Sequence, residues 1–205
     1  MVISDVFQFL FGLVSSKNQM LRDINHLRDG MQNMTSDLIP FTADEFGLVS
    51  YNVANSSQSR GFYRTTMGVV TTIYYEHLFA YNIRMYGERQ YACVIKTDID
   101  EYALVSTKDN NIMVYMNQKE LGHIMNNSQL YNTRNQLIGT IDVKNTPSHK
   151  DIHIKGVPIG YMIKNDKEST YLLRAVELVK SPTSDELYLS AILVFNQLIL
   201  DILKK

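Results

Sequence analysis

The residues best able to do chemistry in this chain are five histidines, one cysteine and a group of carboxylates. His149 and His153 are four residues apart, which on a helix would let both bind one metal ion. Residues 152–154 instead alternate like a strand, and four strand residues span about 13 Å, too far for shared ligation. The other three histidines are isolated in the sequence: His26, His77 and His123. We therefore predict no metal site.

The carboxylates of Asp98-Ile99-Asp100-Glu101 lie between two predicted strands, and we interpret this segment as a solvated turn. Cys93 is the only cysteine, so no internal disulfide forms, and its apolar strand-like surroundings predict a buried, inert thiol. The sequence has no glycine-rich phosphate loop and no nucleophile elbow. We predict no catalytic residues, no cofactor-binding residues and no cofactor. An enzyme whose carboxylates meet only in the folded chain remains an alternative.

Arginines are interleaved with tyrosines between residues 60 and 91. Arg60 and Arg64 would share a strand face near Tyr63, and Arg84 and Arg89 follow. Arginine beside aromatic residues is typical of anion and nucleic-acid sites, although strand preference alone also collects tyrosines. The formal net charge is −1, from 20 basic and 21 acidic residues, so we expect no nucleic-acid partner.

The elements that position these residues begin with a predicted helix over residues 4–36. Its apolar residues follow a heptad spacing interrupted once, at Lys17: Val6, Leu10, Leu13, Met20, Ile24, Leu27, Met31 and Met34. One interpretation is an amphipathic helix that packs on its own domain, and the other is self-association through a short coil. Residues 6–14 are too short to span a bilayer and lack a basic leader, but they could serve as a peripheral membrane anchor.

The remaining 41–205 is predicted to be one β domain, with residues 1–40 as its helical appendage. Thr42 and Glu45 form a capping box that predicts a short helix to about Val49, and the polar run 52–60 predicts an exposed loop. About ten antiparallel strands follow, separated by short turns. Their expected ranges are 62–75, 78–86, 90–97, 101–107, 111–116, 120–125, 136–143, 151–155, 157–164 and 169–179.

Three of these strands share the pattern apolar, Gly, any residue, apolar, centred on Gly122, Gly139 and Gly160. Glycine inside a strand marks a bulge or a close approach, so these positions would let the sheet curve tightly around another element. Similarity between hairpins by chance is the alternative.

The last element is a predicted helix over Asp185–Leu203, capped by Thr183 and Glu186. Ser190, Gln197 and Asp201 form a narrow polar stripe, and apolar residues cover most of the remaining circumference. A surface helix needs a much narrower apolar face, so this helix must be surrounded by protein. A membrane anchor is the competing interpretation, which the polar residues disfavour.

Antiparallel strands that end in such a helix, together with the three glycine patterns, resemble the tubby C-terminal-like superfamily over about residues 62–203. That superfamily includes tubby proteins, phospholipid scramblases and LURP-one-related proteins. The resemblance implies a closed antiparallel barrel around a central hydrophobic helix, and several members bind anionic lipid. The clustered basic residues of tubby proteins and the palmitoylated and calcium-binding segments of scramblases have no counterpart here.

The sequence thus predicts a mostly β fold, an antiparallel β-barrel or wrapped sheet around a central C-terminal helix. The first functional hypothesis is a non-catalytic binding or scaffold module. A lipid- or membrane-surface-associated module and an enzyme are the alternatives. The single cysteine fits a cytoplasmic protein, with peripheral attachment to a membrane as the variant.

Overall fold

The structure, a computed structural model, describes residues 17–60, 63–86, 90–107, 109, 111–142, 148–164 and 174–203, without the side chains of residues 17, 18, 54–60 and 63. Twelve strands in this part of the chain form one sheet, each antiparallel to the next in sequence order. They are β1 (Val49–Arg60), β2 (Tyr63–Thr72), β3 (His77–Met85), β4 (Tyr91–Lys96), β5 (Glu101–Ser106), β6 (Ile112–Met116), β7 (Lys119–Met125), β8 (Gln129–Asn132), β9 (Leu137–Ile141), β10 (His149–Ile154), β11 (Val157–Ile163) and β12 (Val176–Leu178). The predicted antiparallel, mostly β fold is confirmed.

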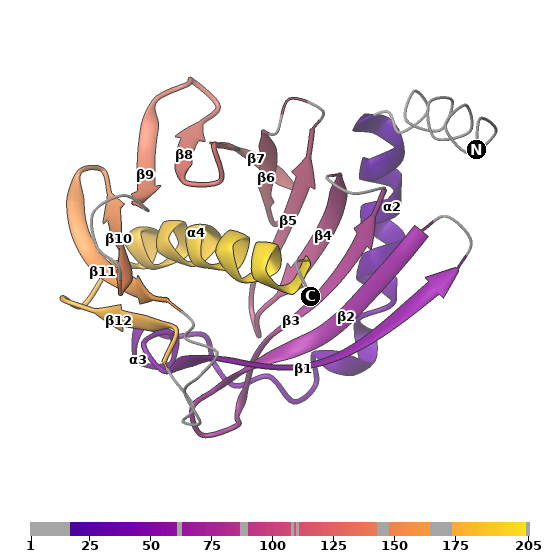
Figure 1. Cartoon of the computed structure of the whole chain (residues 1–205), viewed down its shortest axis with the longest axis horizontal. Helices are drawn as coiled ribbons and strands as arrows, with labels where there is room; N and C mark the ends of the chain where they lie inside the picture. Colours follow the sequence, from indigo (N-terminus) through magenta and orange to yellow (C-terminus); the bar gives the residue numbers. More distant parts are fainter. Residues whose placement is uncertain are drawn as a thin grey trace.

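The two edges of the sheet meet and close it nearly completely. Ser50 in β1 forms an antiparallel bridge with Arg174, just before β12. The amide of Ala175 donates to the carbonyl of Val49 at 2.7 Å. The result is a nearly closed barrel that surrounds the C-terminal helix α4 (Ser184–Leu203) (Figure 1).

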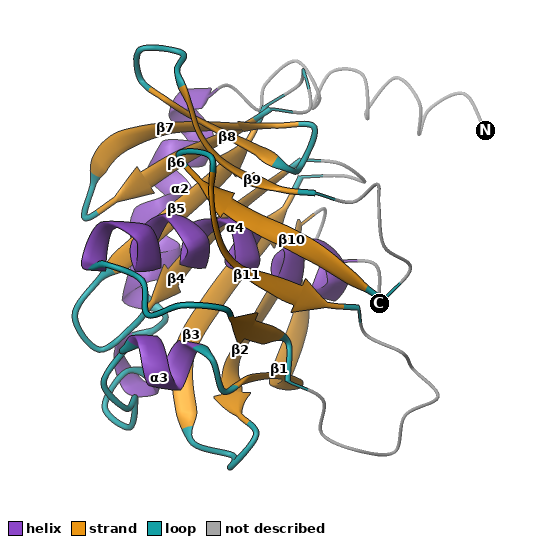
Figure 2. Ribbon diagram, turned by 90° about the vertical axis from the view of Figure 1, so that its left-hand side faces the viewer, coloured by secondary structure: helices purple, strands orange, loops and turns teal. Residues whose placement is uncertain are grey.

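Alternate turns of this barrel lie at the same end, because every connection joins neighbouring antiparallel strands. We call the end that carries α3 (Ala43–Phe46) and the turns after β2, β4, β6, β8 and β10 the cap end. The opposite end is the far end. Because β12 runs toward the cap end, α4 begins there and passes between the strands toward the far end (Figure 2).

The three predicted glycine positions are β-bulges. At each, the register with the preceding or following strand slips beside the glycine, so that two residues face one. The extra residue is the apolar one just before the glycine: Leu121, Ile138 and Ile159. Bulges increase the local twist and bend of a strand, which is what a sheet needs to close around a helix.

Close backbone contact explains why these positions are glycine. A Cβ on Gly122, which has a φ of +154°, would lie 1.8 Å from the carbonyl oxygen of Tyr131. A Cβ on Gly160 would lie 2.3 Å from the carbonyl oxygen of Glu177. At Gly139 the close neighbours are side chains: a Cβ there would be 3.1 Å from Cδ1 of Ile154 in β10 and 3.2 Å from Cδ1 of Leu193 in α4. The expected close approach of the sheet to another element is therefore confirmed at Gly139.

The α4 helix is the core of the barrel, as its all-round apolar pattern predicts. It starts with the expected capping box: the amide of Thr183 donates to Oε2 of Glu186 at 2.8 Å, and the amide of Glu186 donates to Oγ1 of Thr183 at 3.4 Å. Phe195 packs against three rings, with centroid distances of 4.4, 5.3 and 6.0 Å to Phe79, Tyr102 and Phe41. The helix is long and apolar enough to cross a bilayer, but 72% of its apolar stretch is buried inside the barrel.

The N-terminal helix α2 (Lys17–Asp29) packs on the outside of the barrel, across β3, β4 and β5. Its buried residues are Met20, Ile24 and Leu27, followed by Met31 after the helix. The sheet beneath offers small side chains that allow a helix to approach closely: Ala80, Ala92 and Ala103. The described part of the heptad pattern thus packs on its own domain. Val6, Leu10 and Leu13 lie outside the described residues.

The predicted helix 4–36 is wrong beyond Asp29. The chain leaves the helix at Gly30, and a single 3-10 turn follows at Gln32–Met34. The Asn82 side chain of β3 ends the helix, because its Nδ2 donates to the carbonyl of Leu27 at 3.0 Å. A Cβ on Gly30 would lie only 3.1 Å from that same Nδ2.

The predicted loop 52–60 is also wrong, because it forms most of β1. Its residues pair with β2 in an almost continuous register, from Val53 opposite Val70 to Arg60 opposite Tyr63. Ladder hydrogen bonds use backbone groups only, so a small polar composition does not prevent a strand. The short helix expected to reach Val49 ends at Phe46, and β8 within 126–135 was not predicted.

Candidate functional site

Polar side chains inside the barrel gather around the second half of α4. Lys150 in β10 reaches inward, and its Nζ donates to Oε1 of Gln197 at 2.6 Å. Nε2 of Gln197 donates to the carbonyl of Asn127 at 2.5 Å, and Nδ2 of Asn196 donates to the same carbonyl at 3.3 Å. The hydroxyl of Tyr91 donates to Oδ1 of Asn196 at 3.3 Å. These groups satisfy one another, so the network fixes how α4 sits within the barrel.

A second polar contact joins β1 to the end of β11, beside the seam that closes the barrel. The hydroxyl of Tyr51 in β1 donates to the carbonyl of Ile163 at the end of β11. Burial raises the pKa of Tyr51, and the nearby carboxylate of Asp201 on α4 raises it further. Tyr51 therefore stays a neutral hydrogen-bond donor, which suits a structural clasp better than proton transfer.

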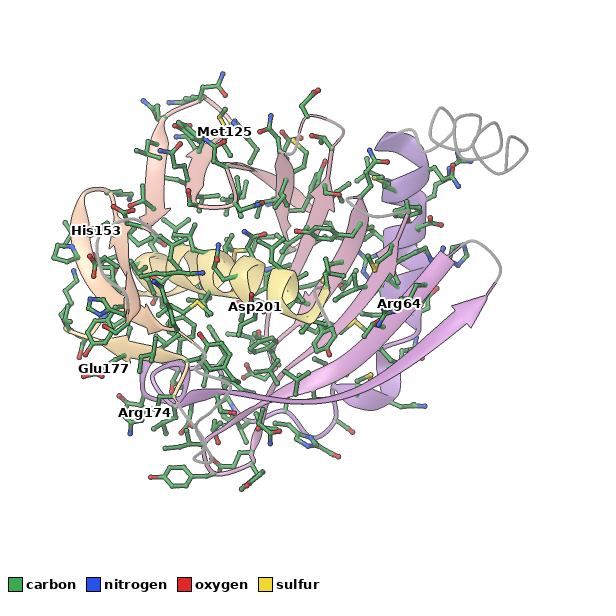
Figure 3. All side chains as sticks on the ribbon, viewed as in Figure 1. Arg64, Met125, His153, Arg174, Glu177 and Asp201 are labelled. Carbon is green, nitrogen blue, oxygen red and sulfur yellow. The ribbon has the colours of Figure 1, made fainter. Side chains whose placement is uncertain are left out.

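Titratable residues on the outer face of β10, β11 and β12 form a cluster at the surface of the described chain. Oγ of Ser148 lies 3.1 Å from Nδ1 of His149, whose Nε2 lies 3.3 Å from Oδ1 of Asp151. The His149 ring packs on Tyr161 with a centroid distance of 4.9 Å. A hydrogen bond to the carboxylate of Glu177 raises the pKa of Tyr161. Glu177 points outward from the barrel in Figure 3.

A serine, a histidine and an aspartate in sequence contact are the residue types of a hydrolytic triad. Here Ser148 and His149 are chain neighbours, and the side chains of His149 and Asp151 are 30% and 43% exposed. Water competes for contacts at such exposure, so each is weak and holds no fixed geometry.

The five histidines considered as possible metal ligands lie on four different elements: α2, β3, β7 and β10. His149 and His153 lie on the same outer face of β10, as the strand alternation implies, and His123 stacks on Tyr131 with a centroid distance of 5.4 Å. His26 lies on α2 and His77 begins β3. Within the described residues, no three histidine, cysteine or carboxylate side chains are grouped so as to hold a metal ion.

The carboxylates of the predicted turn 98–101 are engaged within the protein. Asp98 accepts a hydrogen bond from the amide of Phe41 at 2.9 Å, and Asp100 accepts one from Nδ2 of Asn117 at 2.7 Å. Glu101 forms a two-pronged ion pair with Arg28 of α2 at 2.6–2.9 Å. These three side chains tie the segment before α3, the β6–β7 turn and α2 to one end of the barrel.

The described arginines of the predicted arginine and tyrosine group do not share one face of the sheet. Arg64 pairs with Met85 and Thr65 pairs with Arg84, so the two arginines are neighbours on β2 and β3 that belong to opposite faces. Arg84 pairs with Asp23 of α2 at 2.9 Å, and Arg64 is exposed at the far end. The side chains of Arg60 and Tyr63 and all of Arg89 lie outside the described residues. The predicted buried thiol is confirmed, because Cys93 is fully buried and burial raises its pKa.

Sequence reasoning missed the Lys150 network and the outer cluster. Asn127, Lys150 and Gln197 are far apart in the chain, and no local motif joins them. One signal was present: Lys150 is in phase with the inward residues Ile152 and Ile154, which marks a lysine aimed at the core. The outer cluster had a local signal as well, because Ser148, His149 and Asp151 are close in sequence, but its contacts with Tyr161 depend on strand pairing.

Comparison with known proteins adds no relative: no family model, no curated protein and no solved structure matches this chain. Function is therefore inferred from the surfaces and contacts described above.

Proposed function

We propose that this chain is a non-catalytic binding or scaffold module of tubby-like fold, which contacts its partners with the outside of its barrel. The observation that carries the proposal is that α4 occupies the barrel interior. Thirteen of its residues are buried: Leu187, Leu189, Ser190, Ala191, Ile192, Leu193, Val194, Phe195, Asn196, Gln197, Leu198, Ile199 and Ile202.

The order of elements supports the tubby-like part of the proposal. A meander of twelve antiparallel strands precedes α4, and bulges at the three predicted glycines bend the strands around it. This is the arrangement that the sequence resemblance implies. The barrel wall and its central helix together form one core, which is the scaffold of the module.

The engagement of the polar groups inside the barrel supports the part of the proposal that places partner contacts on its outer surface. Lys150 donates a hydrogen bond to Gln197, and Gln197 donates one to the carbonyl of Asn127, so these side chains hold α4 in place. Exposed aromatic, apolar and charged side chains lie on the turns and on the outer strand faces. Partner contacts of a folded module come from such exposed side chains.

Site-specific photo-cross-linking in the producing cells tests the proposal. A photoreactive phenylalanine would replace one surface residue at a time: the exposed Tyr74, Leu137 or Arg64, or the partly exposed His153, which sample four regions of the surface. We expect the same protein, identified by mass spectrometry, to be cross-linked from one position or from two adjacent ones. The unsubstituted chain is the control. If none of the four positions yields a protein adduct, the module proposal fails.

A membrane-surface role is a second proposal, favoured by the position of the chain start. Asp23 of α2 contacts Arg84 near the end of β3, whereas Arg28 contacts Glu101 at the start of β5, so α2 begins toward the far end. Exposed Arg64, at the start of β2, also belongs to that end. An apolar anchor that precedes α2 would meet anionic lipid together with this exposed arginine.

Vesicle co-sedimentation separates this second role from the first. We expect binding to vesicles with anionic lipid, weaker binding to neutral ones, and loss of binding when residues 1–16 are removed. Deletion should stop there, because removing α2 as well would expose Val69, Ala92 and Val94 on the sheet. If the full chain does not sediment with either vesicle, the membrane proposal is wrong.

A further inference from the structure

The most exposed large apolar side chains of the described chain lie on two neighbouring turns of the cap end. Tyr74 and Tyr75 in the β2–β3 turn are 65% and 63% exposed, and Ile99 in the β4–β5 turn is 67% exposed. Tyr75 also has a φ of 66°, a conformation that glycine or asparagine adopts at lower cost. A large aromatic residue is thus held outward at a position where its backbone is unfavourable.

The segment before α3 joins these two turns into one surface. The amide of Ile39 donates to the carbonyl of His77 at 2.9 Å, at the foot of the β2–β3 turn. Two residues later, the amide of Phe41 donates to Oδ1 of Asp98 in the β4–β5 turn at 2.9 Å. Residues 36–48, 72–77 and 97–100 are therefore contiguous, and Figure 1 shows α3 beside this end of the sheet.

The three segments carry a local excess of negative charge, and Lys96, which directly precedes the third segment, is paired with Glu101 at 3.7 Å. The three segments contain six carboxylates and neither lysine nor arginine: Asp37, Asp44, Glu45, Glu76, Asp98 and Asp100. Four of the carboxylate residues are exposed, namely Asp37, Asp44, Glu76 and Asp98. Oε2 of Glu45 and Oδ2 of Asp100 have no hydrogen-bond partner in the described part of the chain.

The other half of the cap end differs in charge and provides an internal comparison. Its exposed apolar residues are Leu137, Val157 and Val179. Exposed basic residues accompany them on the same turns: Arg134, Lys155 and Lys180. The excess of acidic residues is thus confined to the half formed by β2 to β5 and α3.

We propose that this surface, the cap-end acidic patch (Tyr74, Tyr75, Ile99 and the carboxylates of Asp37, Asp44, Glu76 and Asp98), binds a basic segment of a partner protein. The inference rests on the proposed binding function and names its surface and partner class. Lysine or arginine side chains of the segment pair with the carboxylates and lie over the two tyrosine rings. Aliphatic residues of the same segment cover Ile99.

The charge of the patch decides between occupants. An anionic membrane would be repelled by the exposed carboxylates, whereas a basic protein segment is attracted and oriented by them. Exposed tyrosines suit such contacts because they bury a large area with little loss of side-chain freedom. The partner is therefore a cationic, partly aliphatic segment, and not a lipid surface.

A defined peptide pair tests the charge requirement on the full chain. The probe is a fluorescent peptide of about 12 residues that alternates lysine and leucine, measured by anisotropy at about 0.15 M salt. Peptides with glutamate for lysine, or serine for leucine, are the comparisons. We expect binding of the lysine–leucine peptide only. Equal binding of the glutamate peptide, or no binding of the lysine–leucine peptide, would overturn the inference.

Two matched double variants locate the binding. Tyr74→Ser with Ile99→Ser removes apolar side chains from the patch, and Leu137→Ser with Val157→Ser removes two from the basic half of the same end. We expect at least about a tenfold loss of affinity for the first variant and less than about twofold for the second. Asp44→Asn with Glu76→Gln should weaken binding and flatten its salt dependence. Equal losses in both serine variants would contradict the assignment.

Light scattering and the cross-linking positions complete the test. If the wild-type chain is a dimer that only the Tyr74 and Ile99 variant dissociates, a second copy occupies the patch and the basic-segment proposal is wrong. If a partner cross-links from Leu137, His153 or Arg64 but not from Tyr74, the module function stands and the patch assignment fails. A partner cross-linked from Tyr74 through a basic segment supports both.

Discussion

At the residue scale, the fold depends more strongly on the glycines of the bulges than on any single polar contact. Gly122 and Gly160 each face a neighbouring carbonyl oxygen so closely that no side chain fits without a backbone shift. The polar contacts of the barrel interior are individually exchangeable, because each net hydrogen bond is worth only about 1 kcal/mol. A steric clash at these glycines cannot be relieved in the same way, because the neighbouring strand is tightly packed in a closed sheet.

Alanine substitutions test this steric role. Gly122→Ala and Gly160→Ala should each destabilise the fold by about 3 kcal/mol or more, because the new methyl group displaces the backbone of the next strand. Gly156→Ala is the matched control: its φ is +79°, but nothing lies within 4 Å of the added methyl group. It should cost about 1 kcal/mol. Urea unfolding measures all three, and equal losses would refute the steric explanation.

The cap of α4 makes stability depend on pH through Glu186. Hydrogen bonds from Lys180 and from the amide of Thr183 lower the pKa of Glu186 to about 2, against about 4.3 in an unfolded chain. Because the folded value is the lower one, the carboxylate stabilises fully above the unfolded pKa and loses this effect as pH falls toward 2.

We therefore expect the melting temperatures of the wild type and Glu186→Gln to differ most above about pH 5 and to converge near pH 2. Lys180→Met should reduce the difference, because it removes the group that lowers the pKa most. Thermal unfolding followed from pH 2 to pH 7 gives both results. A difference that stays constant over this range would show that the carboxylate charge plays no part.

At the scale of elements, α2 differs from the strands because it contacts the barrel through one face only. It contacts β3, β4 and β5 through one row of apolar residues, two ion pairs and the hydrogen bond from Tyr86 to Asp23. An element with one packed face can open without unfolding the rest of the domain.

Truncation of a central packing residue tests this independence. Leu27 is almost fully buried between α2 and the sheet, so Leu27→Ala should weaken α2 docking by about 2–5 kcal/mol. Amide exchange in α2 should then accelerate by at least about thirtyfold, since 1.4 kcal/mol is a factor of ten. Exchange in α4 should change far less. Equal acceleration in both helices would mean that α2 opens only with the whole domain.

The elements predicted correctly from sequence are those marked by a local pattern: a periodic apolar face, a capping box, turn residues or a glycine inside a strand. The α4 helix, the turns at 117–118 and 155–156 and the three bulges follow from such local patterns. The strand β1 does not, because its pairing with β2 uses backbone groups that composition does not encode. The Lys150–Gln197 contact and the cap-end acidic patch depend on which turns the barrel brings together, so only the fold reveals them.

At the scale of the whole molecule, the barrel and α4 depend on each other. The sheet closes through a short seam, with one bridge at Ser50 and Arg174, one amide bond to Val49 and the hydrogen bond from Tyr51 to Ile163. That seam is too small to hold twelve strands in a ring by itself. Burial of the thirteen α4 residues supplies the larger stabilisation, because it removes the inner face of the sheet from water.

A charge placed in the middle of α4 should therefore unfold the domain as one unit. Leu193 is fully buried and lies next to Gly139 of β9, so Leu193→Asp would bury an unpaired carboxylate at a cost of several kcal/mol. Leu137→Asp is the matched control, since Leu137 is 49% exposed on the same strand, and it should leave the fold intact. Circular dichroism and cooperative urea unfolding distinguish the two. If the Leu193→Asp chain remains folded and soluble, α4 is not the core that holds the barrel closed.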